Sequence, residues 1–161
     1  MPDSTMLAVA RCTGHWRGEL RSRLGVTGIL ELTCRPVFGG VVHELETNLF
    51  SHDSKYLVGG CTWFAPAGGG GLNGLQYGTA MGLCVVEARE SDAETLVITG
   101  NLPGNMVFTG SIALEDDHLV ISSAVAERGA RAREEDRSVG RLRRVSAATR
   151  LTPARTGKAR S

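Results

Sequence analysis

Two side chains, His43 and Tyr77, carry the chemistry that this sequence could offer to a small molecule. An imidazole titrates near neutral pH, so His43 could serve as a general acid or base, or bind a metal or haem. The phenol of Tyr77 both donates and accepts hydrogen bonds and could orient a carbonyl or a phenol. Each also has a structural interpretation: His43 hydrogen-bonded to Thr47 or to a backbone carbonyl, and Tyr77 packed with its hydroxyl at a rim.

Other catalytic and metal-binding patterns do not occur in the sequence. We find no nucleophile elbow, carboxylate pair or metal triad. The glycine-rich run 65–71 is not followed by Gly-Lys-Ser/Thr, so we interpret it as a mobile hairpin loop that could act as a lid over a cavity mouth, not as a phosphate loop. The cysteines are too far apart for a zinc site, and we expect neither a metal nor a disulfide; they are Cys12, Cys34, Cys61 and Cys84.

The elements that must position these residues begin with the stretch 14–24. There charged residues alternate with Trp16, Leu20 and Leu24, and a period of two is typical of a strand with one wet face and one buried face. The pattern predicts that Trp16 points inward.

The same stretch contains a Gly-x-Trp at Gly14 and Trp16, and a basic cluster around Arg144 ends the last predicted strand. This pairing resembles the calycin superfamily of lipocalins, fatty-acid-binding proteins and nitrobindin-like proteins, and most of all a bacterial branch of lipocalin-like barrels. The resemblance implies a structural role in which Trp16 lies under Arg144, since an indole and a guanidinium stack well. Nitrobindin-like relatives hold haem through a histidine near the C-terminus. This chain has no histidine after His118, so haem is a lesser alternative and we expect no cofactor.

Turn signals divide residues 14–145 into about nine short strands with no helix between them. Successive antiparallel strands that each bury one face close most simply as an up-and-down barrel. We therefore predict an all-β fold with one lipocalin-like barrel of eight to ten strands over 14–145. Residues 1–13 form a lead-in with a short helix that could plug one end, and residues 146–161 form a basic disordered tail.

Projecting the alternation gives an apolar interior with sparse polar groups. In the predicted strand 55–65 either Trp63 with Cys61, or Phe64 with Thr62, faces inward. The candidate ligand-binding residues are Leu20, Leu32, His43, Leu45, Thr47, Trp63, Tyr77, Met81, Phe108, Ile112 and Ile121.

Two functions from different classes follow from this interior. The first is binding of a small hydrophobic molecule in the barrel cavity, which needs only the apolar wall. The second is a cofactor-independent isomerase or cyclase that folds a polyketide-like substrate in the same cavity, with His43, Tyr77 and Trp63 as the polarising groups. The fold alone does not decide between them.

The charge of the chain is unevenly distributed. The net charge is +1, but the tail 146–161 holds four basic residues and no acidic one, which leaves −3 for the rest. Four scattered charges without an aromatic residue make a weak nucleic-acid footprint, so we expect a solvated tail. No apolar run is long enough for a membrane span or a signal-peptide core. We expect a cytoplasmic protein, with a homodimer as a possible assembly.

Overall fold

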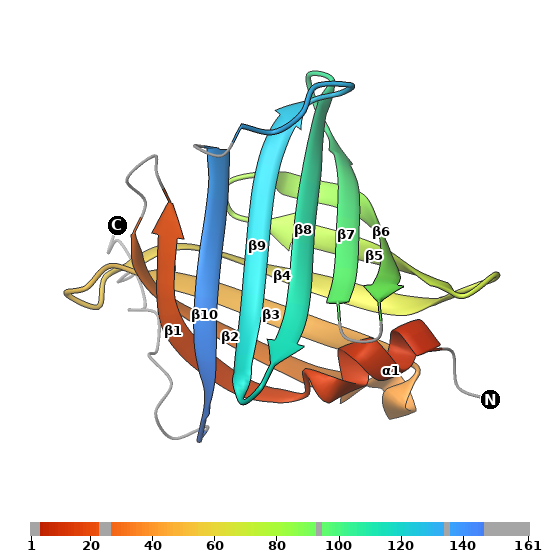
Figure 1. Cartoon of the computed structure of the whole chain (residues 1–161), viewed down its shortest axis with the longest axis horizontal. Coiled ribbons are helices and arrows are strands. Elements are labelled where there is room, and N and C mark those ends of the chain that lie inside the picture. The colour runs from red at the N-terminus through yellow and green to blue at the C-terminus, as the bar shows by residue number, and fades with distance from the viewer. Residues whose placement is uncertain (1–3, 23–26, 93–94, 134–135, 147–161) are drawn as a thin grey trace, which may run out of the picture.

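The computed structural model describes residues 4–22, 27–92, 95–133 and 136–146 of the 161 in the chain. In these residues ten antiparallel strands close into one barrel, in which β1 meets β10 and every other strand pairs with its neighbours in sequence (Figure 1). The predicted all-β barrel is confirmed. The elements are α1 (Ser4–Arg11), β1 (Gly14–Ser22), β2 (Gly28–Val37), the 3-10 turn η1 (Phe38–Gly40), β3 (Val42–Phe50), β4 (Tyr56–Ala67), β5 (Gly71–Gly78), β6 (Gly82–Asp92), β7 (Thr95–Leu102), β8 (Met106–Glu115), β9 (His118–Glu127) and β10 (Arg137–Val145).

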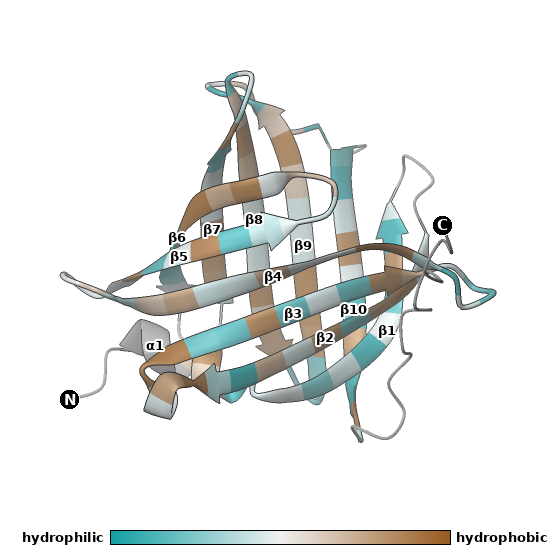
Figure 2. Ribbon diagram, turned by 180° about the vertical axis from the view of Figure 1, so that it is seen from behind, coloured by the Kyte–Doolittle hydropathy of each residue, from teal (hydrophilic) through white to brown (hydrophobic). Residues whose placement is uncertain are grey.

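The inward and outward alternation is clearest in β2 and β3. On β3 the side chains of His43, Leu45 and Leu49 are buried, while the carboxylates between them lie on the other face. Bands of hydrophobic and hydrophilic residues alternate along both strands in Figure 2. The antiparallel register sets Leu45 beside Cys34 on β2 and beside Thr62 on β4, so one row of inward residues continues from strand to strand.

The helix α1 closes one end of the barrel, as the lead-in was expected to do. It lies across the lower end in Figure 1 and contacts β2, β5, β6 and β7. Val9 is fully buried and belongs to the main apolar cluster, and Cys12 just after the helix is 5% exposed. The helix is eight residues long, and no helix in the described part of the chain is long and apolar enough to cross a membrane.

Trp16 and Arg144 form the contact that the resemblance implied. The guanidinium carbon of Arg144 lies 4.4 Å from the centre of the Trp16 ring, and an Arg144 N–H donates to the carbonyl of Thr13 at 2.6 Å. The indole N–H of Trp16 donates to the carbonyl of Cys12 at 2.7 Å. Gly14 has φ of +138° and a Cβ there would strike the Arg144 side chain, so glycine is needed at this point. The contact ties the end of β10 to the connection between α1 and β1.

Glycines mark three of the connections between strands. The chain turns between Gly78 and Gly82, which joins β5 to β6, and Gly82 has φ of +74°. The turn η1 joins β2 to β3, and Val41 after it is 62% exposed. The loop at the glycine run is shorter than the predicted 65–71, because β4 continues to Ala67 and β5 begins at Gly71. Most of the predicted tail, residues 147–161, lies outside the described residues.

Candidate functional site

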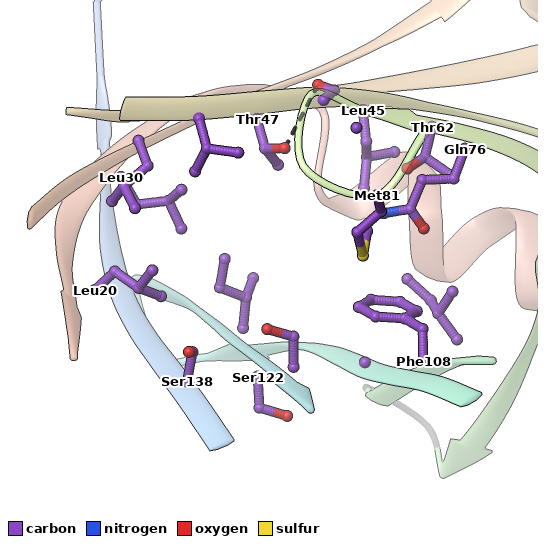
Figure 3. Close-up of a pocket in the computed structure, with 18 of the residues that line it drawn as sticks. Leu20, Leu30, Leu45, Thr47, Thr62, Gln76, Met81, Phe108, Ser122 and Ser138 are labelled. Carbon is purple, nitrogen blue, oxygen red and sulfur yellow. Dashed lines mark hydrogen bonds between the residues drawn. The ribbon is translucent and has the colours of Figure 1, made fainter. Parts of the chain in front are cut away.

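A cavity of about 460 Å³ lies inside the barrel (Figure 3). No residue of α1 lines it, and aliphatic side chains and glycines make up most of its wall. The lining residues are Leu20, Leu30, Leu32, Leu45, Thr47, Leu49, Val58, Gly59, Gly60, Thr62, Gln76, Gly78, Ala80, Met81, Ile98, Phe108, Gly110, Ser111, Ile112, Ile121, Ser122, Ser123, Ala124, Val125, Asp136 and Ser138.

Cross-strand pairing brings these residues together from distant parts of the sequence. Leu20 on β1 pairs with Gly140 on β10, and Ile112 on β8 pairs with Ile121 on β9. Leu20 and Phe108 lie on opposite sides of the space in Figure 3. Inward residues of neighbouring strands stand in rows, so nine of the ten strands contribute to the wall, and the described residues of β6 do not.

Most of the candidate ligand-binding residues line this cavity. The structure places there Leu20, Leu32, Leu45, Thr47, Met81, Phe108, Ile112 and Ile121. Their part in binding remains a prediction, since their position shows only that they face the space.

Trp63 and Tyr77 were candidate ligand-binding residues, but neither faces the cavity; of the two alternatives for the strand 55–65, the structure has Phe64 with Thr62 inward. Phe64 is fully buried and Thr62 lines the cavity, so the residue between them must face outward. The indole N–H of Trp63 donates to Glu44 Oε2 at 2.8 Å on the outer face. Tyr77 pairs with Cys61, is 50% exposed and does not line the cavity.

His43 faces inward but lies apart from the cavity. It is 6% exposed, pairs with Pro36 and Phe64, and is not among the lining residues. Its Nδ1 atom is buried and finds no hydrogen-bond partner among the described residues. Thr47, its expected partner, donates instead to the carbonyl of Gly60 at 3.4 Å. Burial lowers the pKa of His43, so the neutral imidazole is favoured.

The sequence analysis missed the principal polar group of the wall, Gln76. Thr62 on β4 and Gln76 on β5 are direct cross-strand partners, and both line the cavity. Figure 3 shows the two side chains together beside Met81. The alternation along β5 could have found Gln76, because a residue next to an outward Tyr77 must face inward. The missing information was which alternate set of residues on β5 faces the interior.

The turn at the cavity is also a different one from that expected. Ala80 and Met81, between β5 and β6, line the cavity, whereas none of residues 65–71 does. The prediction that the glycine run forms a lid over the cavity mouth is therefore wrong. Thr79 holds the β5–β6 turn against β4, since its hydroxyl donates to the carbonyl of Gly59 at 3.2 Å and accepts from the Gly59 N–H at 3.1 Å.

The cavity wall is almost free of charge. Among the described residues that line it, Asp136 is the one with an ionisable side chain, and it precedes β10. The remaining polar side chains are hydroxyls and one carboxamide. Ser123 and Ser138 contribute two of the hydroxyls and are cross-strand partners on β9 and β10. Such a wall can orient a ligand through neutral hydrogen bonds.

The donor set does not suit haem or a metal. Haem iron is held by His, Cys, Met or Tyr, and of these the described lining residues include only Met81. No group of three or more His, Cys, Asp or Glu residues in the described part of the chain could hold a metal ion. Burial raises the pKa of the Cys12 thiol to about 11 and of the Cys34 thiol to about 12, and both lie outside the cavity wall.

Comparison with known proteins gives the fold and no family. No family model matches the chain, and no curated protein matches it. The crystal structure of Rv2717c from M. tuberculosis has a TM-score of 0.68 at 13% identity, over 90% of this chain and 98% of that one. A redesigned β-barrel, b11L5F_LGL, has a TM-score of 0.45 at 12% identity, over 86% of this chain and 96% of that one. EF1p2_mFAP2b, solved bound to DFHBI, has a TM-score of 0.48 at 14% identity, over 89% of this chain and 99% of that one. The likeness to Rv2717c supports a β-barrel fold and nothing about function.

Proposed function

We propose that this protein binds a small hydrophobic molecule inside the barrel. The observation that carries the proposal is the cavity of about 460 Å³ with its largely apolar wall. Ligand sites commonly measure about 300–1,000 Å³ and combine apolar walls with a few polar groups. Leu30, Leu45 and Phe108 would supply apolar contacts, and Thr62 and Gln76 would supply the polar ones.

The Trp16–Arg144 stack supports a place for this barrel in the calycin superfamily. The resemblance implied this contact, and the guanidinium carbon of Arg144 lies 4.4 Å from the centre of the Trp16 ring. The stack lies near α1 and contributes no residue to the cavity wall. It supports the ancestry of the barrel without bearing on the ligand.

The enzyme alternative receives no support from the geometry. His43 lies away from the cavity, and Tyr77 is on the outer face. Neither could reach a substrate in the barrel as a general acid or base, which requires hydrogen-bond distance to the reacting atom. We therefore do not propose the isomerase or cyclase.

Fluorescence titration with an apolar, environment-sensitive naphthalene dye tests the binding proposal. The informative variant is Ile121→Trp, which places a large side chain into the space that Ile121 lines. The matched control is Val85→Trp, because Val85 is 67% exposed on the outer face of β6. We expect the first variant to weaken dye binding by at least about 10-fold, a change of about 1.4 kcal/mol, and the second to leave it unchanged.

Two results would contradict the proposal. One is a wild-type protein that takes up no dye, which would mean that the cavity does not admit ligands. The other is equal weakening by both variants, which would place the dye on the outer surface. Thermal unfolding of each variant confirms that it is folded before the titration is interpreted.

A further inference from the structure

Apart from Asp136, the polar part of the cavity wall is neutral, and this restricts which ligands it can hold. Thr47, Thr62, Gln76, Ser123 and Ser138 line the cavity, and no lysine, arginine or histidine does so among the described residues. A carboxylate or ammonium that enters an apolar space loses its water shell, and only an opposite charge or several hydrogen bonds can offset that loss. This wall offers no positive charge to a carboxylate.

The cross-strand pair Thr62 and Gln76 is the strongest polar anchor in that wall. The two residues are direct partners on β4 and β5, and their side chains lie together in Figure 3. Thr47 is less available, because its hydroxyl proton is donated to the carbonyl of Gly60. The structure gives the Gln76 amide no hydrogen-bond partner among the described residues. Its N–H groups and its carbonyl can therefore both be offered to a ligand.

A carboxamide that both donates and accepts matches groups of the same kind. A ligand carbonyl can accept from the Gln76 N–H, and a ligand hydroxyl or amide can also donate to its oxygen. A purely apolar ligand would cover the amide without replacing its hydrogen bonds to water, which is unfavourable. The best occupant of the site has one such group near Thr62 and Gln76 and an apolar body extending along Leu30 and Leu45.

We infer that the ligand is an uncharged amphiphile, with an apolar body and one hydroxyl, carbonyl or carboxamide held by Gln76 and Thr62, and that fatty-acid anions are poor ligands. The inference rests on the proposed function, because it names the ligand class of the same cavity. Asp136, the acidic residue in the described wall, disfavours anions further by repulsion.

Displacement of the bound dye by matched ten-carbon probes tests the inference at pH 7. The probes are decanamide, 1-decanol and decanoate, which share an apolar chain and differ in the headgroup. We expect decanamide and 1-decanol to displace the dye at concentrations at least about 10-fold lower than decanoate, which is about 1.4 kcal/mol.

Variants of the anchor separate it from the rest of the wall. Gln76→Leu should remove most of the preference for decanamide over decanoate while dye binding persists. The control is Asn73→Leu, an exposed polar residue on the same strand whose side chain is on the outer face. It should leave every affinity unchanged. Gln76→Arg should reverse the preference, so that decanoate becomes the better of the two ligands.

The outcomes distinguish the two proposals. If the wild-type protein binds neither dye nor probes, the proposed function fails and this inference fails with it. If it binds the dye, and decanoate displaces that dye as well as decanamide does, the inference is overturned while the proposed function stands. If the neutral probes are preferred but Gln76→Leu and Thr62→Val both leave that preference intact, the assignment of the anchor is overturned. The wild-type comparison remains decisive even where a variant does not fold.

Discussion

The two ends of the barrel interior are filled differently, although the same inward alternation runs through both. Near α1 the inward side chains are large: Trp16, Phe64 and Leu72 are at most 2% exposed. Toward the cavity, the row that begins at Thr47 continues through Gly60 and Gly78, which have no side chain to fill the space. The alternation therefore decides which face is buried, and side-chain volume decides whether that face forms a core or a cavity.

Truncating one phenylalanine at each end tests this comparison most strongly. Phe64→Ala should lower the free energy of unfolding by about 3–5 kcal/mol, because Phe64 is fully buried and its removal leaves a void. Phe108→Ala should cost clearly less, since Phe108 already borders the cavity and is only partly buried. Urea unfolding of both variants measures the difference. Equal losses would show that the cavity end is as tightly packed as the helix end.

Removing the guanidinium at the helix end should have a smaller effect. Arg144→Met deletes the stack on Trp16 and the hydrogen bond to Thr13, and we expect a loss of about 1 kcal/mol because Arg144 is exposed to solvent. Arg143→Met is the matched control, since the exposed side chain of Arg143 donates to Nε2 of half-buried His118 at 3.0 Å and does not stack on the indole. Thermal unfolding at constant salt compares the two, and a control that costs as much would remove the special role of the stack.

His43 should produce the smallest effect, a pH dependence of stability. Its pKa is lowered in the folded state by burial, so the unfolded chain binds more protons. Stability is therefore retained above the ordinary pKa of 6.5 and declines as the pH falls below that value. His43→Gln should flatten this decline of stability, whereas the control His52→Gln, at an exposed histidine, should not. Urea midpoints from pH 7.5 down to pH 5 measure both slopes, and parallel slopes for wild type and His43→Gln would contradict the assignment.

The predicted homodimer stays a prediction, as does the role of the tail.

Four exposed apolar side chains form a strip on the outer face of β5 and β6: Leu75, Tyr77, Leu83 and Val85. Leu75 pairs with Val85 and Tyr77 pairs with Leu83, so the strip is continuous across the two strands. It explains why hydrophobicity misplaced Tyr77: on these strands the outer face carries the larger apolar side chains.

The sequence by itself determined the architecture, because strand alternation and turns are local properties. The period of two placed Trp16 inward, and the turn signals separated about nine of the strands in what is a ten-stranded barrel. The short helix at the N-terminus was likewise predictable from a hydroxyl followed by an apolar run.

Only the tertiary structure decided the phase of β4 and β5 and the depth of each inward residue. Trp63 and Phe64 are both apolar, so the pattern of β4 allows either residue to face the interior, and cross-strand pairing selected Phe64. The same choice brought Gln76 inward and left Tyr77 outside. Whether an inward residue such as His43 meets the cavity or the packed end depends on how far along the barrel it stands. That position follows from the register of all ten strands together, which no local pattern contains.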